Sequence, residues 1–495
     1  MSAIKKLASQ TAIYGLSSMI GRFLNYLLVP LYTRVFERAE YGVVSEFYAY
    51  ISFLLILFTY GMETAFFHFS HKEDKDKVYS NGLFMLLCSS VLISMVFILS
   101  SSSLANAIGY PNKGIYIVWI TLIIAFDALA ALPFARLRQQ NKAVQFTTYR
   151  LLNILLNIFL NFFFLWVCPK YVNADGGLLT QIANSVYSKQ IGIGYVFISN
   201  LLSSFITFLL MLPQYRNITF KPDVELLKKM LLYASPLLIA GFAGMINETL
   251  DRAVYKYLAP NPKTALAELG VYSACYKLSI IITIFIQTFR FAAEPFFFSH
   301  AKKDEKREVF ARVMKYFVII CAFIFVVVML YIDVIKLFIG EEYRTGLAVV
   351  PILMMANICL GIFYNLSMWY KVTGQTKYGA YFAMFGATVT IILLMVLIPK
   401  FGYMGAAWAT LVTYAGMMVL SYITGQKNYP VPYNVKEVFT YLFVALMVYF
   451  AGLGINKLLA PQGATHWLLQ TALLAAFVLI IYLIEKPKHQ LEKIS

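Results

Sequence analysis

Charged side chains are scarce in this sequence. Asp, Glu, Lys and Arg make up 13% of the 495 residues, whereas apolar residues make up 60% and the mean hydropathy is +0.70. A soluble core of this size does not need so much apolar surface. Repeated apolar segments of roughly 20 residues, each long enough to cross about 30 Å of hydrocarbon, predict an all-α polytopic membrane protein.

Cysteine is scarce too, and the motifs of several enzyme classes are missing. The five cysteines are scattered, with no Cys-x-x-Cys pair and no histidine at ligand spacing, which favours small buried apolar residues over a metal site. There is no P-loop, and "GIGYVF" is the start of a predicted helix rather than a dinucleotide loop. No soluble domain is large enough for a glycosyltransferase. We therefore expect no enzyme, no metal and no organic cofactor.

The basic residues that give the net charge of +17 lie in short connections between the apolar segments. This placement indicates control of membrane orientation rather than nucleic-acid binding. The termini and every second connection hold roughly twice as many Lys and Arg as the other connections, which predicts both termini in the cytoplasm. The first apolar run contains Arg22 and is followed by no A-x-A site, so we expect a retained helix rather than a cleaved signal.

Fourteen segments have the length and composition of a membrane span. They lie near residues 11–35, 42–68, 79–101, 114–136, 146–168, 191–213, 229–255, 268–298, 312–333, 343–370, 376–398, 402–424, 436–458 and 466–485.

The chain also repeats itself. Three pairs of segments match in order, "MIGRFLN" with "MINETLD", "AEYGVVSEFYAY" with "AELGVYSACYKL", and "FHFSH" with "FFFSH". Each pair is 226 to 229 residues apart, and the second pair is identical at six of twelve positions. A duplicated unit of six spans, in parallel orientation, explains all three, and transporters place the substrate between such halves. The predicted division is an N-lobe at 1–213, a cytoplasmic linker at 214–228, a C-lobe at 229–424, and two extra spans with a cytoplasmic tail at 425–495.

Several predicted spans contain charges, and a charge at mid-bilayer costs at least ~2.5 kcal/mol. Four of them are cations: Arg22, Arg252, Lys277 and Arg290. Arg and Lys bind phosphate oxygens strongly where the dielectric is low, so this set predicts a water-filled cavity for a substrate that carries phosphate. The alternative is that the cations only pair with nearby carboxylates and hold the bundle together.

Five carboxylates in the predicted spans are candidates for charge pairing or ion coupling: Glu63, Asp127, Glu248, Asp251 and Glu294. The repeat places Arg22 opposite Glu248, and the hairpin of spans 7 and 8 places Asp251 and Lys277 at similar depth, so each couple is expected to pair.

Other polar side chains in the spans admit two explanations each. Glu63 and Asp127 are lone carboxylates, and each is either a carrier of a coupling proton or a neutral, hydrogen-bonded packing residue. For Glu63 a further alternative is a position close enough to the cytoplasmic interface to contact water. Glu46 is expected near the outer interface, in contact with water. Span 5 carries a polar stripe, for which hydrogen bonding between helices is the simpler explanation and a cavity lining is the other. The stripe consists of Arg150, Asn153, Asn157 and Asn161.

Over nearly its whole length the chain resembles the oligosaccharide flippases of the MOP superfamily (O-antigen and capsule type, Wzx-like). The resemblance rests on "GRFLNYLLVPLYTRVFERAEYGVVSEFY", "NETLDRAVYKYLAPNPKTALAELGVYSACYKLS", "FRFAAEPFFFS" and "GYMGAAWATLVTY". It implies a MATE-like bundle of twelve core helices in two lobes plus two extra helices, about 14 in all. The related lipid II flippases have an arginine in span 1 near Arg22 and further cavity cations, which Arg252, Lys277 and Arg290 match here.

The resemblance also implies a function. The expected activity is export of an undecaprenyl-pyrophosphate-linked oligosaccharide from the cytoplasmic to the periplasmic leaflet of the bacterial inner membrane by alternating access. The expected partners are this lipid-linked oligosaccharide, membrane lipid and polysaccharide assembly proteins, with no nucleic acid. The coupling ion is expected to be H⁺ or Na⁺.

Two other functions stay open at this point. A MATE-type exporter of organic cations has the same fold, but it favours an acidic cavity and twelve spans. A membrane-bound polysaccharide polymerase, ligase or assembly protein favours a long outer loop with catalytic groups, and the outer loops here are short.

Overall fold

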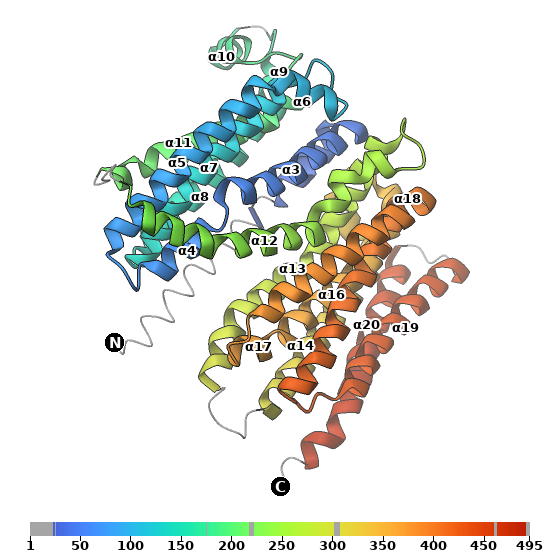
Figure 1. Cartoon of the computed structure of the whole chain (residues 1–495). Helices are drawn as coiled ribbons and strands as arrows, with labels where there is room; N and C mark the ends of the chain where they lie inside the picture. The colour runs from blue at the N-terminus through green and yellow to red at the C-terminus, as the bar shows by residue number, and fades with distance from the viewer. Residues whose placement is uncertain are drawn as a thin grey trace. The chain divides into compact units, whose positions relative to one another are not determined.

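The computed structural model describes residues 23–24, 26–174, 176–216, 222–300, 307–459 and 463–491. In these ranges the chain forms helices and turns and no strand (Figure 1). Within the described residues, twelve helices are long and apolar enough to cross a membrane. The all-α polytopic fold is therefore confirmed.

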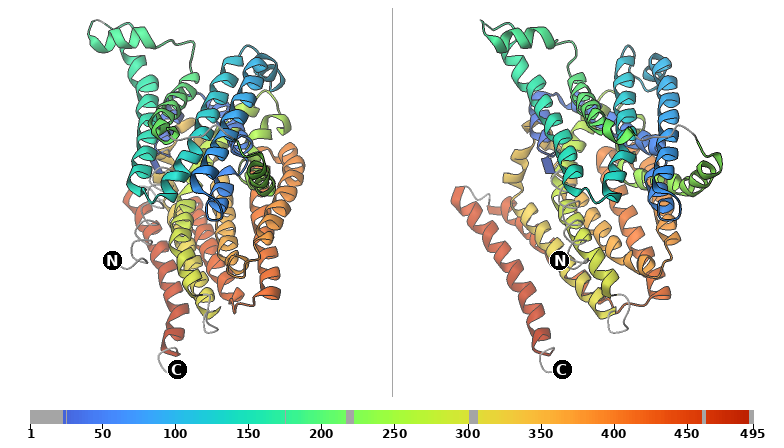
Figure 2. Two further views of the ribbon diagram at one scale, coloured as in Figure 1. Left: turned by 60° about the vertical axis from the view of Figure 1, so that its left-hand side comes forward. Right: turned by 90° about the vertical axis from the view of Figure 1, so that its left-hand side faces the viewer.

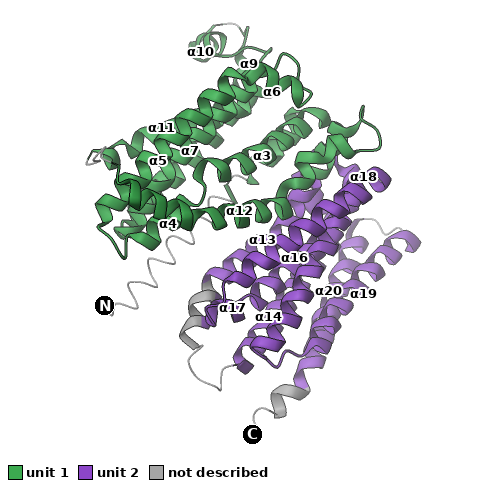
Figure 3. Cartoon of the chain, viewed as in Figure 1, with its two compact units in different colours: residues 1–273 green, residues 274–495 purple. Residues whose placement is uncertain are grey.

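Two compact units make up the chain (Figure 3). Unit 1, residues 1–273, contains α2 (Leu28–Val35), α3 (Arg38–Thr59), α4 (Met62–Phe69), α5 (Lys75–Leu99), α6 (Ser101–Ala107), α7 (Gly114–Gln139), α8 (Ala143–Phe162), α9 (Cys168–Tyr171), α10 (Leu178–Val186), α11 (Gly194–Met211), α12 (Val224–Leu258) and the start of α13 (Ala265–His300). Unit 2, residues 274–495, contains the rest of α13, then α14 (Arg307–Leu330), α15 (Ile332–Ile335), α16 (Val349–Leu366), α17 (Met368–Val372), α18 (Lys377–Asn428), α19 (Val435–Leu459) and α20 (Gly463–Leu491).

The fourteen predicted spans and the twelve helices differ in number for two reasons. The 52-residue α18 has non-helical torsions at Gly402 (φ 56°, ψ −139°), so it consists of two helices that match the predicted spans 376–398 and 402–424. A φ of this sign is open to glycine and strained for other residues. Most of the first predicted span, 11–35, lies outside the described residues.

The second predicted span is broken in its middle. α3 begins with a capping box in which Glu37 and Glu40 each bind the other's backbone N–H. It ends at Tyr60, and Tyr60 and Gly61 both have left-handed torsions (φ 32° and 73°). The chain then continues as α4. This break lets the two parts of the span point in different directions.

The predicted duplication is visible where α3 meets α13. A Cβ added to Gly42 would lie 1.9 Å from the Leu266 carbonyl oxygen, and one added to Gly270 would lie 1.9 Å from the Arg38 carbonyl oxygen. With the repeat's offset of 228 residues (39 to 267), Gly42 corresponds to Gly270 and Arg38 to Leu266. The two contacts are therefore one contact repeated by an approximate twofold axis, as in the interface of a symmetric dimer. Only glycine allows backbones to approach this closely.

Two cores hold unit 1 together. One joins α4, α5, α7 and α12 and includes the fully buried Phe66, Leu86 and Met230. The other joins α7, α8 and α11 around Phe134 and Leu137. Contacts thus group α12 with α3, α4 and α5. The lobe boundary placed at 214–228 from the sequence stays a prediction.

In unit 2, α16 packs against α18 and α14 packs against α19, and α19 also contacts α20. Between its terminal turns, α19 exposes large apolar side chains at helical spacing: Phe439, Phe443, Met447 and Phe450. A soluble protein would bury such a stripe, so this face is suited to lipid.

The longest connection in unit 1 lies between α8 and α11. A π-helical turn at Phe163–Val167 leads from α8 into α9, and α10 follows. In Figures 1 and 2 this segment extends beyond the ends of α5 and α7. Its sequence, "KYVNADGGLLTQIANSVYSKQ", is polar and nearly uncharged.

Candidate functional site

A buried carboxylate joins three segments of unit 1. Glu46 of α3 has no exposed surface, and its Oε1 lies 2.7 Å from Lys256 Nζ of α12. The hydroxyl of Tyr110, which lies between α6 and α7, donates to Glu46 Oε2 at 2.5 Å. The hydroxyl of Tyr50, one turn further along α3, also donates to Glu46. The expectation that Glu46 contacts water is therefore wrong.

Lys256 is equally well enclosed. Its side chain is 12% exposed, and its ammonium group donates to the Ile108 carbonyl as well as to Glu46. The ammonium lies 4.0 Å from the centre of the Tyr110 ring and 5.0 Å from that of Tyr257. Tyr257 in turn shares a 3.3 Å hydrogen bond with Tyr50. We call Glu46, Tyr50, Tyr110, Lys256 and Tyr257 the Glu46 network.

The tyrosines of the Glu46 network act as hydrogen-bond donors. Burial and the neighbouring Glu46 carboxylate raise the pKa of Tyr110, so its hydroxyl stays protonated. Two hydroxyls and one ammonium then satisfy the carboxylate completely, which is the condition for an ion pair to persist in low dielectric.

The Glu46 network also connects the two halves of the duplication. Glu46 belongs to the second predicted span and lies one turn after Gly42, whereas Lys256 ends the seventh span, shortly before Gly270. The ion pair and the glycine contact are thus two links between the halves at the same end of unit 1. The charge bias of the connections predicts that this end lies on the outer side, and this orientation stays a prediction.

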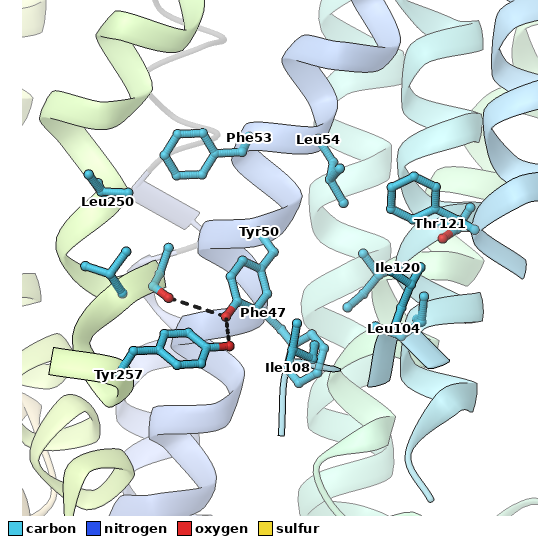
Figure 4. Close-up of a pocket in the computed structure, with 14 residues that line it drawn as sticks. Phe47, Tyr50, Phe53, Leu54, Leu104, Ile108, Ile120, Thr121, Leu250 and Tyr257 are labelled. Atoms are coloured by element: carbon cyan, nitrogen blue, oxygen red, sulfur yellow. Dashed lines mark hydrogen bonds between the residues drawn. The ribbon is translucent and has the colours of Figure 1, made fainter. Parts of the chain in front are cut away.

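An apolar pocket of about 480 Å³ lies beside the Glu46 network (Figure 4). Its walls come from α3, α5, α6, α7 and α12 and include Phe47, Phe53 and Leu250. The Tyr50 hydroxyl borders it and bonds to Tyr257 and to the Ala253 carbonyl, as the dashed lines show. Because its walls are almost entirely apolar and none of its lining residues is charged, this pocket offers no cationic partner for a pyrophosphate.

The predicted site residues on α12 form a second polar cluster. The Tyr272 hydroxyl donates to the buried Asp251 at 2.6 Å, and the Arg252 backbone N–H donates to the same carboxylate at 2.8 Å. The Arg252 guanidinium lies 3.4 Å from Asp251 and donates to the backbone carbonyl of the exposed Glu248 at 2.7 Å. In this conformation the Arg252 guanidinium therefore contacts the Asp251 carboxylate and a backbone carbonyl of the same helix.

The predicted cations of unit 2 lie on α13. Arg290 is half-buried, and its guanidinium stacks 4.0 Å from the centre of the Tyr364 ring of α16. Lys277, also half-buried, is 13 residues earlier, which is about 20 Å along a helix. One pyrophosphate group therefore cannot touch both Lys277 and Arg290 at once. The expected pair of Asp251 with Lys277 joins the two units and stays a prediction.

Two further predicted carboxylates have identified neighbours. Glu63 forms an ion pair with Arg138 of α7, and its side chain is 42% exposed. Asp127 lies beside Ser204 of α11 and Arg150 of α8. Of the remaining predicted residues, Arg22 lies outside the described part of the chain, and so does the side chain of Glu294.

The polar stripe of span 5 bonds to other helices, as predicted. Asn153 of α8 donates to the Thr207 hydroxyl of α11 at 2.8 Å, and the Tyr32 hydroxyl of α2 donates to Asn161 at 2.9 Å. Four of the five cysteines are buried, but Cys88 is exposed, so the expectation of burial is wrong for that residue. Among the described residues, no three His, Cys, Asp or Glu side chains are grouped for a metal.

The comparisons with known proteins agree with this geometry. A model of the polysaccharide biosynthesis protein family matches residues 7–300, and no curated protein matches the chain. The fold is similar to that of the lipid II flippase MurJ in an inward closed conformation, with a TM-score of 0.74 and 14% identity over 96% of this chain and 99% of that one.

Other transporters of the MOP superfamily are similar over a smaller part of the chain. An inward-facing MATE family transporter of the MOP superfamily has a TM-score of 0.63 and 13% identity, over 86% of this chain and 98% of that one. A MOP superfamily transporter from Pyrococcus furiosus has a TM-score of 0.58 and 15% identity over the same shares. At these identities the likeness shows the two-lobed MOP fold alone. Since the family model covers more than half of the sequence, the chain belongs to the polysaccharide biosynthesis protein family.

Proposed function

We propose that the protein is a flippase that moves an undecaprenyl-pyrophosphate-linked oligosaccharide from the cytoplasmic to the outer leaflet of the bacterial cytoplasmic membrane. The family match carries this proposal, because it links the chain to polysaccharide biosynthesis. The fold, with its many apolar helices, is similar to that of a lipid flippase and is consistent with transport across a membrane.

The extent of the fold favours a lipid-linked substrate over an organic cation. The similarity to the lipid II flippase covers 96% of this chain, whereas that to the MATE transporter covers 86%. The predicted cavity charges point the same way, because three of the four cations, Arg252, Lys277 and Arg290, lie on α12 and α13.

The cations contact the head group in succession rather than together. Lys277 and Arg290 are about 20 Å apart along α13, which is more than half of the hydrocarbon thickness. In this proposal a pyrophosphate that crosses the membrane meets Arg290 nearer the cytoplasmic side and Lys277 nearer the outer side. Arg22 joins the set, and an inward-moving H⁺ or Na⁺ drives the cycle.

The first test is made in cells that lack the protein. We expect the lipid-linked oligosaccharide to accumulate in the cytoplasmic leaflet and the wild-type gene to restore its export. Arg290→Ala should lower export at least about tenfold, since a charge-assisted bond to phosphate is lost, and Arg290→Lys should retain part of it.

Arg307→Ala provides the matched control. Arg307 also stacks on a tyrosine, with its guanidinium 4.7 Å from the centre of the Tyr429 ring, but it lies at the first residue of α14, beside the connection after α13. This variant should export normally. Equal losses in Arg290→Ala and Arg307→Ala would assign both arginines a structural role, and normal export without the protein would contradict the proposal.

A further inference from the structure

We infer that Glu46 is a proton-binding site at the outer end of the passage, and that a proton from the outer side replaces Lys256 as its partner when α3 and α12 separate. The inference rests on the proposed transport function, because the movement of the two halves is part of that function. It places the ion on a residue that the sequence analysis expects in contact with water and does not count among the ion-coupling candidates.

The first step is the enclosure of the carboxylate. Glu46 has no exposed surface, and among the described residues its cationic partner is Lys256 at 2.7 Å. A carboxylate kept in this environment stays charged only as long as the cation stays beside it. The hydroxyls of Tyr50 and Tyr110 favour the charged form, but they add no positive charge.

The second step is the origin of the two partners. Glu46 comes from the first copy of the duplication and Lys256 from the second. In duplicated transporters the halves rock against each other around the substrate. A movement that opens this end therefore pulls the carboxylate and the ammonium apart, and the glycine contact between Gly42 and Gly270 opens with them.

The third step concerns the groups that surround Glu46. Tyr50 lies on its own helix, Tyr110 precedes α7, and Lys256 and Tyr257 come from α12. On α7 itself, Tyr116 lies near Glu40 rather than Glu46. After separation, the Lys256 ammonium is hydrated, whereas Glu46 retains only the hydroxyls of Tyr50 and Tyr110 as partners. A proton from the outer water then binds to the carboxylate, and it is released when Lys256 returns.

The expected consequence is a dependence of outer opening on external acid. One proton bound in the open form and absent from the closed form changes the equilibrium by up to about tenfold for each unit of external pH. Acid on the cytoplasmic side should not have this effect, because in this proposal the separation of α3 and α12 exposes Glu46 to the outer water only.

The first arm of the test needs no substrate. In purified protein in lipid nanodiscs, Lys256→Met imitates the separated state. Infrared spectra should show a protonated carboxylic acid band that Lys256→Met/Glu46→Gln lacks. Absence of this band from Lys256→Met even at acid pH would overturn the inference.

The second arm measures transport of a fluorescent lipid-linked oligosaccharide in vesicles with acid on one side. Wild type should accelerate with acid at the outer end, and Glu46→Gln, in which Lys256 retains an amide oxygen as partner, should lose this response. The matched control is Glu485→Gln. Glu485 of α20 has the same kinds of partner as Glu46, a lysine and a tyrosine, but within unit 2: Lys315 at 2.7 Å and the Tyr441 hydroxyl.

The possible outcomes separate the two proposals. A full response to external acid in Glu46→Gln would overturn the proton site and leave the flippase intact. A wild type that moves no lipid, together with the infrared band in Lys256→Met, would overturn the flippase and leave the proton site intact. Loss of the response in Glu485→Gln as well would show a general effect of removing buried ion pairs, and would also overturn the assignment to Glu46.

Discussion

Gly42→Ala and Gly270→Ala should each weaken the contact between α3 and α13 by about 3 kcal/mol, the upper part of the range for overpacking a well-packed site. Each new Cβ would lie 1.9 Å from a backbone carbonyl oxygen, and a backbone atom cannot move aside as a flexible side chain can. The two helices must therefore shift apart. Because the same contact is repeated by the approximate twofold axis, the two variants should behave alike.

The measurement is the midpoint of heat unfolding in detergent, followed by size-exclusion chromatography. Gly244→Ala is the matched control, since Gly244 lies in α12 and nothing approaches its added Cβ within 4 Å. This variant should be as stable as wild type or slightly more stable, because alanine loses less backbone entropy. If Gly42→Ala were as stable as Gly244→Ala, the close contact of the two copies would be refuted.

Lys256→Met should have the second large effect, a loss of about 3–5 kcal/mol in the free energy of unfolding, as for other buried ion pairs that lose one partner. Methionine keeps most of the length of the lysine side chain but leaves Glu46 without its cation. An unpaired buried carboxylate takes up a proton rather than stay charged. The loss should therefore be smaller at acid pH than at alkaline pH, because the folded state then binds the extra proton.

A double-mutant cycle tests the origin of this loss. Lys256→Met/Glu46→Gln should recover most of the stability, because both charges are removed together. Lys229→Met removes the partner of Glu225 in an exposed i, i+4 pair on the same helix and should change nothing measurable. Additive losses in the double variant would mean that Glu46 and Lys256 do not depend on each other.

The duplication is the feature that sequence reasoning predicts most usefully. Matching "AEYGVVSEFYAY" with "AELGVYSACYKL" aligns Gly42 with Gly270, and the structure brings these two residues into contact. The pattern cannot show that contact by itself, because a glycine in a span is equally consistent with close packing inside one half.

Glu46 shows where sequence reasoning fails. Counting residues from the end of the span placed it near the outer interface, but the depth of a residue along a helix does not show what covers it. The cover comes from Tyr110 and Lys256, which are 64 and 210 residues away in the sequence. Two signals were present: a tyrosine four residues after Glu46, and a lysine between two tyrosines at 255–257.

The predicted cations show a second limit. Composition placed Arg252, Lys277 and Arg290 in one cavity, because all three lie in apolar spans. Counting residues along the helix already separates Lys277 from Arg290 by about 20 Å. The sequence does not show that Arg252 contacts Asp251 and a backbone carbonyl. A count of charges predicts that a polar path exists, whereas the order of contacts along it depends on packing.

The most direct test of the proposed function uses purified protein in vesicles that contain a fluorescent undecaprenyl-pyrophosphate-linked oligosaccharide in one leaflet. A membrane-impermeant quencher then reports how much of the lipid has reached the other leaflet. We predict transfer that is much faster than in protein-free vesicles and that Arg290→Ala slows about tenfold. Transfer at the protein-free rate, with export of an organic cation by the same vesicles, would contradict the flippase and favour a multidrug exporter.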